Sequence, residues 1–162
     1  MVDSMTTYTS TTDSKAAFSG NSKLLTNNGH ITLNTHCGKL VRGYNGGDWS
    51  YTHILKCRET QPLVRVTLSD GRSVDCSLDT HFFIDDNFNS MSLDDILSHY
   101  RQTLEKRPEI YTNKNTTHHA YEYQKLITYD LIENEVIHST YHITTIDSAH
   151  RAFINNILLR CW

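Results

Sequence analysis

Residues 64–83 read VRVTLSDGRSVDCSLDTHFF, and this stretch decides the expected fold. Apolar residues occupy every second position from Val64 to Leu68, which is the period of a strand with one buried face. Asp70-Gly71 then supplies the positive φ angles that a tight hairpin turn requires. The second strand runs into SLDTH, a cluster of hydroxyl, carboxyl and imidazole side chains. We therefore expect a β-hairpin that carries chemically active side chains at its end.

Short strand-like runs continue on both sides of this hairpin. Residues 24–26 precede the turn signal Asn-Asn-Gly, and residues 40–44 precede Asn-Gly-Gly. Residues 109–120 are polar and rich in Asn and Thr, so we expect a loop there. Further strands are expected at 121–129, 136–145 and 152–159, which makes the chain mainly β.

One helix interrupts the strands. Ser92 begins a capping box with Asp95, and apolar residues at helical spacing form one stripe from Leu93 to Leu104. Basic residues and then Pro108 end the segment. The stripe is narrow and the other face is polar. We therefore expect a helix over residues 92–107 that lies outside the β core.

Length and composition favour one compact domain. The chain has 162 residues, of which 38% are hydrophobic and 20% charged. Residues 1–16 are mostly Ser, Thr and Asp, a composition that does not offset the entropy of ordering, so we expect a flexible leader before a domain at 17–162. The net charge is −3 and the 15 basic residues form no run, which argues against nucleic acid as a partner. No apolar stretch is long enough to span a membrane.

Cysteine and histidine spacing gives no sign of a metal or cofactor site. The four cysteines are far apart and form no C-x-x-C pair. Free thiols fit a reducing compartment, so we expect a cytoplasmic protein. We also expect a monomer that needs no metal or cofactor. Three of the cysteines are expected to be small buried hydrophobic residues, namely Cys37, Cys57 and Cys76.

Three segments, in this order, resemble the motif blocks of inteins, the protein-splicing family. The first is AFSGNSKLLTNNG from Ala17; the second joins GYNGGDWS at 43–50 to residues 64–83; the third is YHITTIDSAHRAFINNILL at 141–159. The resemblance covers nearly all of residues 17–161 and is greatest to the inteins of ribonucleotide reductase large subunits or to bacterial-intein-like domains. It implies a Hint fold, a flattened β horseshoe with a pseudo-twofold axis that brings both ends of the domain together. A helix where larger members carry an endonuclease makes this a mini-intein.

The resemblance implies a single-turnover reaction on the chain itself. Inteins perform splicing or self-cleavage by an N-to-S or N-to-O acyl shift at their first residue, followed by C-terminal processing, and their partners are their own flanking segments. Ala17 occupies the position of that nucleophile and carries neither thiol nor hydroxyl, so the first step is blocked. Either Ala17 replaces a cysteine, or the domain begins naturally with alanine and Cys161 attacks the Ala16–Ala17 bond directly.

Other site residues follow from the same resemblance. His81 would protonate the departing nitrogen, because imidazole titrates near neutrality. Ser77 or Thr80 would hold the scissile peptide; the family pattern is Thr-x-x-His, and the step from Ser77 to His81 is one residue longer. Either a bulge absorbs the extra residue or Thr80 serves instead. His150 would serve the C-terminal step, and His142 would activate a nucleophile from a position usually held by Asp.

The end of the domain departs from the family pattern. Inteins end in His-Asn before a nucleophile, whereas Arg160 and Cys161 stand at these positions in an ungapped alignment. Alternatively, Cys161 is the first residue after the module. Cys lacks the carboxamide that ring closure by Asn needs. A second interpretation of the whole chain is therefore a degenerate Hint-like β module that only binds a partner or links domains.

Overall fold

The computed structural model describes residues 16–100, 107–115, 117–132 and 139–162 of the chain. Within these residues the protein is mainly β with one helix, as the sequence predicts. The strands are β1 Phe18–Ser19, β2 Lys23–Thr26, β3 Gly29–Thr32, β4 Leu40–Tyr44, β5 Trp49–Lys56, β6 Val64–Leu68, β7 Ser73–Cys76, β8 His81–Phe83, β9 Ser90–Ser92, β10 Glu109–Lys114, β11 Thr117–Leu131, β12 Thr140–Thr145, β13 Arg151–Ile154 and β14 Ile157–Arg160, and the helix is α1 Leu93–Tyr100.

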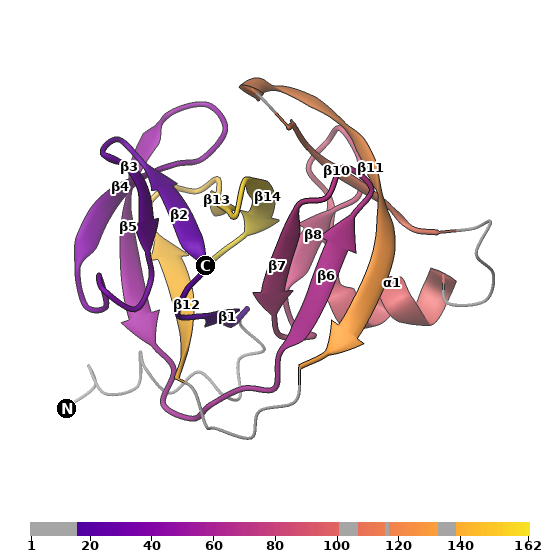
Figure 1. Cartoon of the computed structure of the whole chain (residues 1–162). Coiled ribbons are helices and arrows are strands. Elements are labelled where there is room, and N and C mark those ends of the chain that lie inside the picture. Colours follow the sequence, from indigo (N-terminus) through magenta and orange to yellow (C-terminus); the bar gives the residue numbers. More distant parts are fainter. Residues whose placement is uncertain (1–15, 101–106, 116, 133–138) are drawn as a thin grey trace.

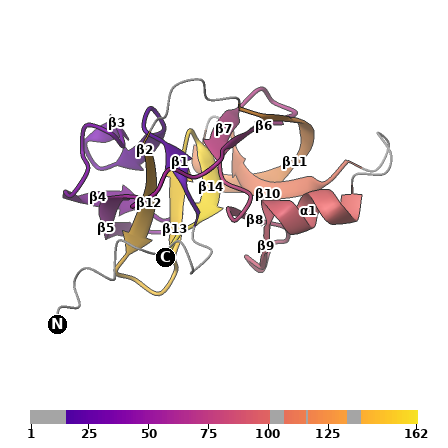
Figure 2. The ribbon, with the colours of Figure 1, turned by 90° about the horizontal axis from the view of Figure 1, so that it is seen from below.

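The strands form one continuous, curved sheet with two lobes. Its order is β10-β11-β6-β7-β1-β12-β5-β4-β2-β13-β14-β8-β9, with β3 paired to β2. Figure 1 shows β2 to β5 in one lobe and β6, β7, β8, β10 and β11 in the other. Figure 2 shows the same separation from below, with β1, β12, β13 and β14 between the lobes. Both ends of the domain thus lie in the centre of a horseshoe.

The hairpin of residues 64–83 forms as predicted. β6 and β7 pair antiparallel with Val64 opposite Cys76, and Gly71 adopts a φ of 95° in the turn. The Leu68 N–H donates to the carbonyl of Arg72 at 2.8 Å and closes the turn. The side chains of Val64, Val66 and Leu68 are buried, so the alternation of the sequence does mark the buried face.

The helix begins where the capping box predicts, but it packs differently. The Asp95 N–H donates to the Ser92 hydroxyl at 3.2 Å. Leu93 and Ile96 are 0% and 1% exposed and belong to the main hydrophobic core, so the expectation that the helix lies outside the β core was wrong. Its first turn is fixed by the Leu93 N–H, which donates to Thr80 O at 2.8 Å. Residues 101–106 of the predicted helix lie outside the described residues.

The loop expected at residues 109–120 is instead the β10–β11 hairpin. Thr112 and Asn113 are fully buried, and their polar groups have partners inside the protein. The Thr112 hydroxyl accepts the Leu158 N–H at 2.9 Å, and Arg72 donates to the Asn113 side chain at 3.0 Å. Polar composition predicted exposure here because sequence alone cannot show that these groups are satisfied.

The single strand expected at residues 152–159 is instead a hairpin of two strands. β13 and β14 pair with Ile154 opposite Ile157. The turn between them consists of Asn155 and Asn156, with φ angles of 51° and 64°. Asparagine tolerates the left-handed region better than other non-glycine residues, which makes Asn-Asn a turn signal that the continuous apolar pattern obscured.

Most buried apolar side chains form one core that runs through the centre of the molecule. Its fully buried members include Phe18 of β1, Ile54 of β5 and Phe82 of β8. Cys76 is buried as expected, but Cys37 is exposed and Cys57 is only half-buried. Among the described residues, no helix is long and apolar enough to cross a membrane.

Candidate functional site

The peptide between Ala16 and Ala17 is buried in the centre of the horseshoe. Ala16 and Ala17 are 2% and 1% exposed. The Ala17 N–H donates to the Ser77 hydroxyl at 3.0 Å, and the Ser77 N–H donates to the Ala17 carbonyl at 2.9 Å. Ser77 therefore binds the backbone on both sides of the Ala17 Cα. We call Ala16, Ala17, Ser77 and Thr80 the N-terminal site.

A tight turn after β7 brings Thr80 to the same place. The Thr80 N–H donates to Ser77 O at 3.1 Å, and the two hydroxyl oxygens lie 3.4 Å apart. Thr80 is fully buried and also hydrogen-bonds the Cys76 thiol. Burial raises the pKa of that thiol to about 12, so Cys76 is protonated at neutral pH. The sequence left open whether Ser77 or Thr80 holds the scissile peptide. In the structure the Ser77 hydroxyl contacts Ala17, and the Thr80 hydroxyl lies next to that of Ser77.

His81 faces a different part of the molecule. It follows Thr80 directly and is the first residue of β8, but its described contacts are with other residues than those of Thr80. Its Nδ1 lies 3.2 Å from the Ser90 hydroxyl and its ring lies edge-on to Trp162, with centroids 5.6 Å apart. Burial and then the neighbouring charge of Arg160 lower the pKa of His81. None of its described contacts reaches Ala17.

The other end of the domain forms a second group, the C-terminal site of Thr145, His150, Cys161 and Trp162. The Cys161 N–H donates to His150 O at 2.8 Å. The Thr145 hydroxyl lies 3.3 Å from His150 Nδ1 and also hydrogen-bonds the Cys161 thiol. Burial raises the pKa of Cys161 to about 12 despite that hydrogen bond. No sequence motif singles out Thr145, although it links His150 and Cys161, which the resemblance does single out.

His142 lies between the two sites on β12. It is 2% exposed, and its Nδ1 lies 3.5 Å from the Cys57 thiol. Burial raises the pKa of Cys57, and a hydrogen bond with Thr140 opposes that rise. Cys57 and His142 are 85 residues apart, so no local motif could predict their contact.

Both ends of the domain bind one edge of β12. Phe18 pairs with Tyr141, and this antiparallel register, continued by one residue, sets Ala17 beside His142. The Trp162 N–H donates to Ile143 O at 3.2 Å, and the Thr145 N–H donates to the Trp162 carbonyl. The other edge of β12 is filled by β5. Two residues of strand separate the attachment points, a distance of about 7 Å.

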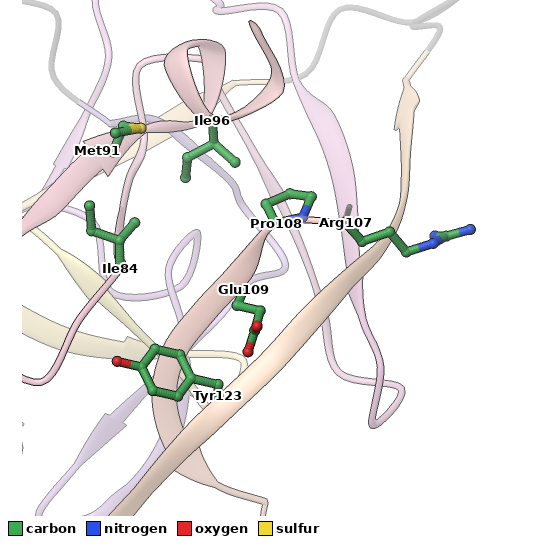
Figure 3. A pocket seen from close by; sticks show the side chains of 7 residues that line it. All are labelled: Ile84, Met91, Ile96, Arg107, Pro108, Glu109 and Tyr123. Carbon is green, nitrogen blue, oxygen red and sulfur yellow. The ribbon is translucent and has the colours of Figure 1, made fainter. Parts of the chain in front are cut away.

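A pocket of about 360 Å³ lies away from both sites. Figure 3 shows its lining from the helix, β10, β11 and neighbouring segments. Ile96 and Met91 give it an apolar wall, and Glu109 and Tyr123 a polar one. None of the site residues that the resemblance to inteins implies lines it. The described residues contain no group of three or more His, Cys, Asp or Glu side chains placed to hold a metal ion.

A curved sheet with both ends of the domain bound to its central strand is the architecture of the Hint fold, and solved structures of inteins share this fold. The chain matches the Ssp DnaB mini-intein variant M86 with a TM-score of 0.72 at 10% identity, over 91% of this chain and 95% of that one. The gp41-1 intein matches with a TM-score of 0.63 at 16% identity, over 90% and 98% of the two chains. The bacterial intein-like domain from Clostridium thermocellum gives 0.60 at 16% identity, over 90% and 98%. No family model and no curated protein matches the sequence.

Proposed function

We propose that this chain is a self-processing domain of the intein type that acts once on its own flanking segments, and that Ala17 blocks its first step. The observation that carries the proposal is the hydrogen bond between the Ala16–Ala17 peptide and the Ser77 hydroxyl. A hydroxyl 3.0 Å from the Ala17 nitrogen is placed to act on the group that must leave during an acyl shift. The missing part is the nucleophile, since an alanine methyl group cannot attack a carbonyl.

Ser77 accepts the hydrogen bond of the Ala17 N–H, and neither Ser77 nor Thr80 is an effective acid for the leaving nitrogen. Their hydroxyls lie 3.4 Å apart behind the Ala17 N–H. Neither titrates near neutral pH, so they can orient the peptide but transfer a proton poorly. His81 lies against Trp162, and we assign it to the C-terminal side instead. A chain given a nucleophile at position 17 should therefore react slowly.

Direct attack by Cys161 on the Ala16 carbonyl is the less favoured route. Burial raises the pKa of this thiol to about 12, so almost none of it is ionised at pH 7. The Thr145 hydroxyl hydrogen-bonds the thiol of Cys161. The described bond between His150 and Cys161 is to the backbone N–H of Cys161 and not to its sulfur. His150 is suited to polarise the peptide that follows Cys161. His142 of β12 is suited to assist a nucleophile at position 17, because His142 lies beside that position.

The second candidate is a Hint-fold module that holds its flanking segments without cleaving them. Three positions favour it together: Ala17 lacks a nucleophile, Thr80 is three residues after Ser77 where the family pattern has His, and Cys161 stands where Asn is expected. In either case the partners are the chain's own flanking segments, and we propose that no cofactor, metal, nucleic acid or membrane takes part and that the domain acts as a cytoplasmic monomer.

Restoring the nucleophile tests the proposal. The Ala17→Cys variant should exchange the amide between residues 16 and 17 for a thioester, and added thiol should then release the leader, residues 1–16. Intact mass spectrometry detects both fragments, with the parent chain as control and circular dichroism to confirm folding. A folded Ala17→Cys chain that stays intact in thiol would favour the non-cleaving module.

A further inference from the structure

The backbone of Trp162 is held as if it were a strand residue. Its N–H donates to Ile143 O, and its carbonyl accepts the Thr145 N–H. These two bonds place it opposite Thr144, along the same edge of β12 that binds β1. These two bonds therefore fix the direction of the residue after Cys161 while it is docked on β12.

The indole ring of Trp162 is held by two cationic or ionisable side chains on different strands. The His81 ring meets it at 86° with centroids 5.6 Å apart, and the Arg160 guanidinium carbon lies 5.4 Å from its centroid. Both side chains are themselves held by one hydroxyl: Ser90 Oγ lies 3.2 Å from His81 Nδ1 and 3.5 Å from Arg160 Nη1. The ring is half-buried and packs against the main core.

We propose that His81, Ser90 and Arg160 form a subsite that recognises an aromatic side chain on the residue immediately after Cys161. A guanidinium over a ring requires the electron-rich face of an aromatic system, and a T-shaped pair requires a second ring. An aliphatic side chain of similar size could fill the space but offers no such face. The subsite rests on the proposed function, in which residue 162 belongs to the C-terminal segment on which the domain acts, and it sets the specificity of that junction.

The contacts that make the subsite are independent of the N-terminal site. Ser77 and Thr80 act on Ala17, whereas His81 and Ser90 extend from β8 and β9, which pair with each other, and β8 also pairs with β14. One chain segment, Ser77 to His81, therefore supplies the N-terminal site through its hydroxyls and the C-terminal site through its imidazole.

Hydrogen exchange of the Thr145 amide tests the subsite without requiring cleavage, because that amide is protected only while Trp162 is docked. In the full chain, Trp162→Ala should speed exchange of Thr145 at least tenfold, and Trp162→Phe should stay within about threefold of the parent. Trp162→Leu is the decisive control, because it keeps apolar volume but has no ring, and it should behave like Trp162→Ala. The Val66 amide, in the distant β6–β7 hairpin, reports whether each variant is folded.

Replacement of the subsite residues should remove the preference. In an Arg160→Met chain, the exchange rates for Trp162→Phe and Trp162→Leu should converge to within about twofold. Equal protection by Leu and Phe in the parent background would overturn the proposal, as would unchanged exchange in Trp162→Ala. Because no bond is cleaved in this assay, an inert Ala17→Cys chain would contradict the proposed function and not the recognition of the ring.

Discussion

The Ser77 hydroxyl lies 3.0 Å from the backbone nitrogen of Ala17, a residue 60 positions earlier in the chain. The bond is buried, and a reciprocal bond from the Ser77 N–H to the Ala17 carbonyl fixes its geometry. A peptide at the start of the domain is thus held at the position where a self-processing domain would act on it. This arrangement and the contacts around it have measurable consequences.

An imidazole at position 80 should accelerate leader release. Thr80 lies behind the Ser77 hydroxyl, three residues after Ser77, and is a poor acid. In the Ala17→Cys background, Thr80→His should raise the rate of thiol-induced release by about 10²- to 10⁴-fold, the range typical of a positioned general acid. His81→Ala in the same background is the matched control and should change the rate less than threefold. If His81→Ala slowed leader release and Thr80→His did not accelerate it, His81 would be the general acid.

Loss of the Ser77 hydroxyl should destabilise the parent chain. The Ala17 N–H is buried and this hydroxyl is its described acceptor. Leaving a buried donor without a partner costs about 1–3 kcal/mol, so Ser77→Ala should lower the free energy of unfolding by that amount. Ser77→Thr retains the hydroxyl and should cost less than Ser77→Ala. Urea unfolding measures both, and an unchanged midpoint for Ser77→Ala would show that water or another group replaces the hydroxyl.

His81 should titrate below the ordinary histidine value of about 6.5. Burial and the charge of Arg160 lower its pKa, and the charges of Asp79 and Asp95 oppose this only partly. The neutral form is therefore favoured in the folded state, and the proton is taken up only as the pH falls below that value. Because protonated imidazole quenches indole fluorescence, the emission of Trp162 in a Trp49→Phe chain follows this titration.

The same titration separates the two causes of the shift. Arg160→Met removes the nearby charge and should raise the midpoint of the Trp162 quenching curve, whereas His99→Gln, which changes a histidine of the helix, should leave it in place. A midpoint at or above 6.5 in the parent, or one that Arg160→Met does not move, would contradict the described position of the imidazole.

The buried threonine of β10 should contribute to stability although the sequence suggests a loop. Thr112 accepts the Leu158 N–H at 2.9 Å and donates to the Asn113 side chain at 3.0 Å. Thr112→Val keeps the shape but leaves a buried N–H without this acceptor, so the free energy of unfolding should fall by about 1–3 kcal/mol. Thr117→Val leaves no buried donor without a partner, so it should change the free energy of unfolding by no more than about 0.5 kcal/mol. A neutral Thr112→Val variant would indicate that β10 is not part of the cooperative core.

The sequence predicts most of the fold where local signals agree with tertiary packing. The alternation from Val64 to Leu68 and the capping residue Ser92 both appear as expected. It fails where polar residues are buried with partners, as at Thr112 in β10, and where an apolar run hides a turn, as at Asn155. Both failures arise because long-range partners determine the structure of these segments.

The candidate site is predicted in part for a similar reason. The resemblance to inteins singles out Ala17, Ser77 and Cys161, and the structure places both ends of the domain on β12. The resemblance could not determine which way the side chains of Thr80 and His81 point, because that depends on one turn after β7. The contacts of Ser90 with Arg160 and of His81 with Trp162 join segments far apart in the chain, and the nearby pair Thr145 and His150 matches no motif.

The most direct test of the central claim is the rate of leader release from Ala17→Cys compared with that from Ala17→Cys/Ser77→Ala, followed by intact mass spectrometry in added thiol. If Ser77 holds the scissile peptide for attack, the first chain should release residues 1–16 and the second should do so at least tenfold more slowly while still folded. Equal rates in the two folded chains would contradict a role for Ser77, and absence of release from both would contradict self-processing at this peptide.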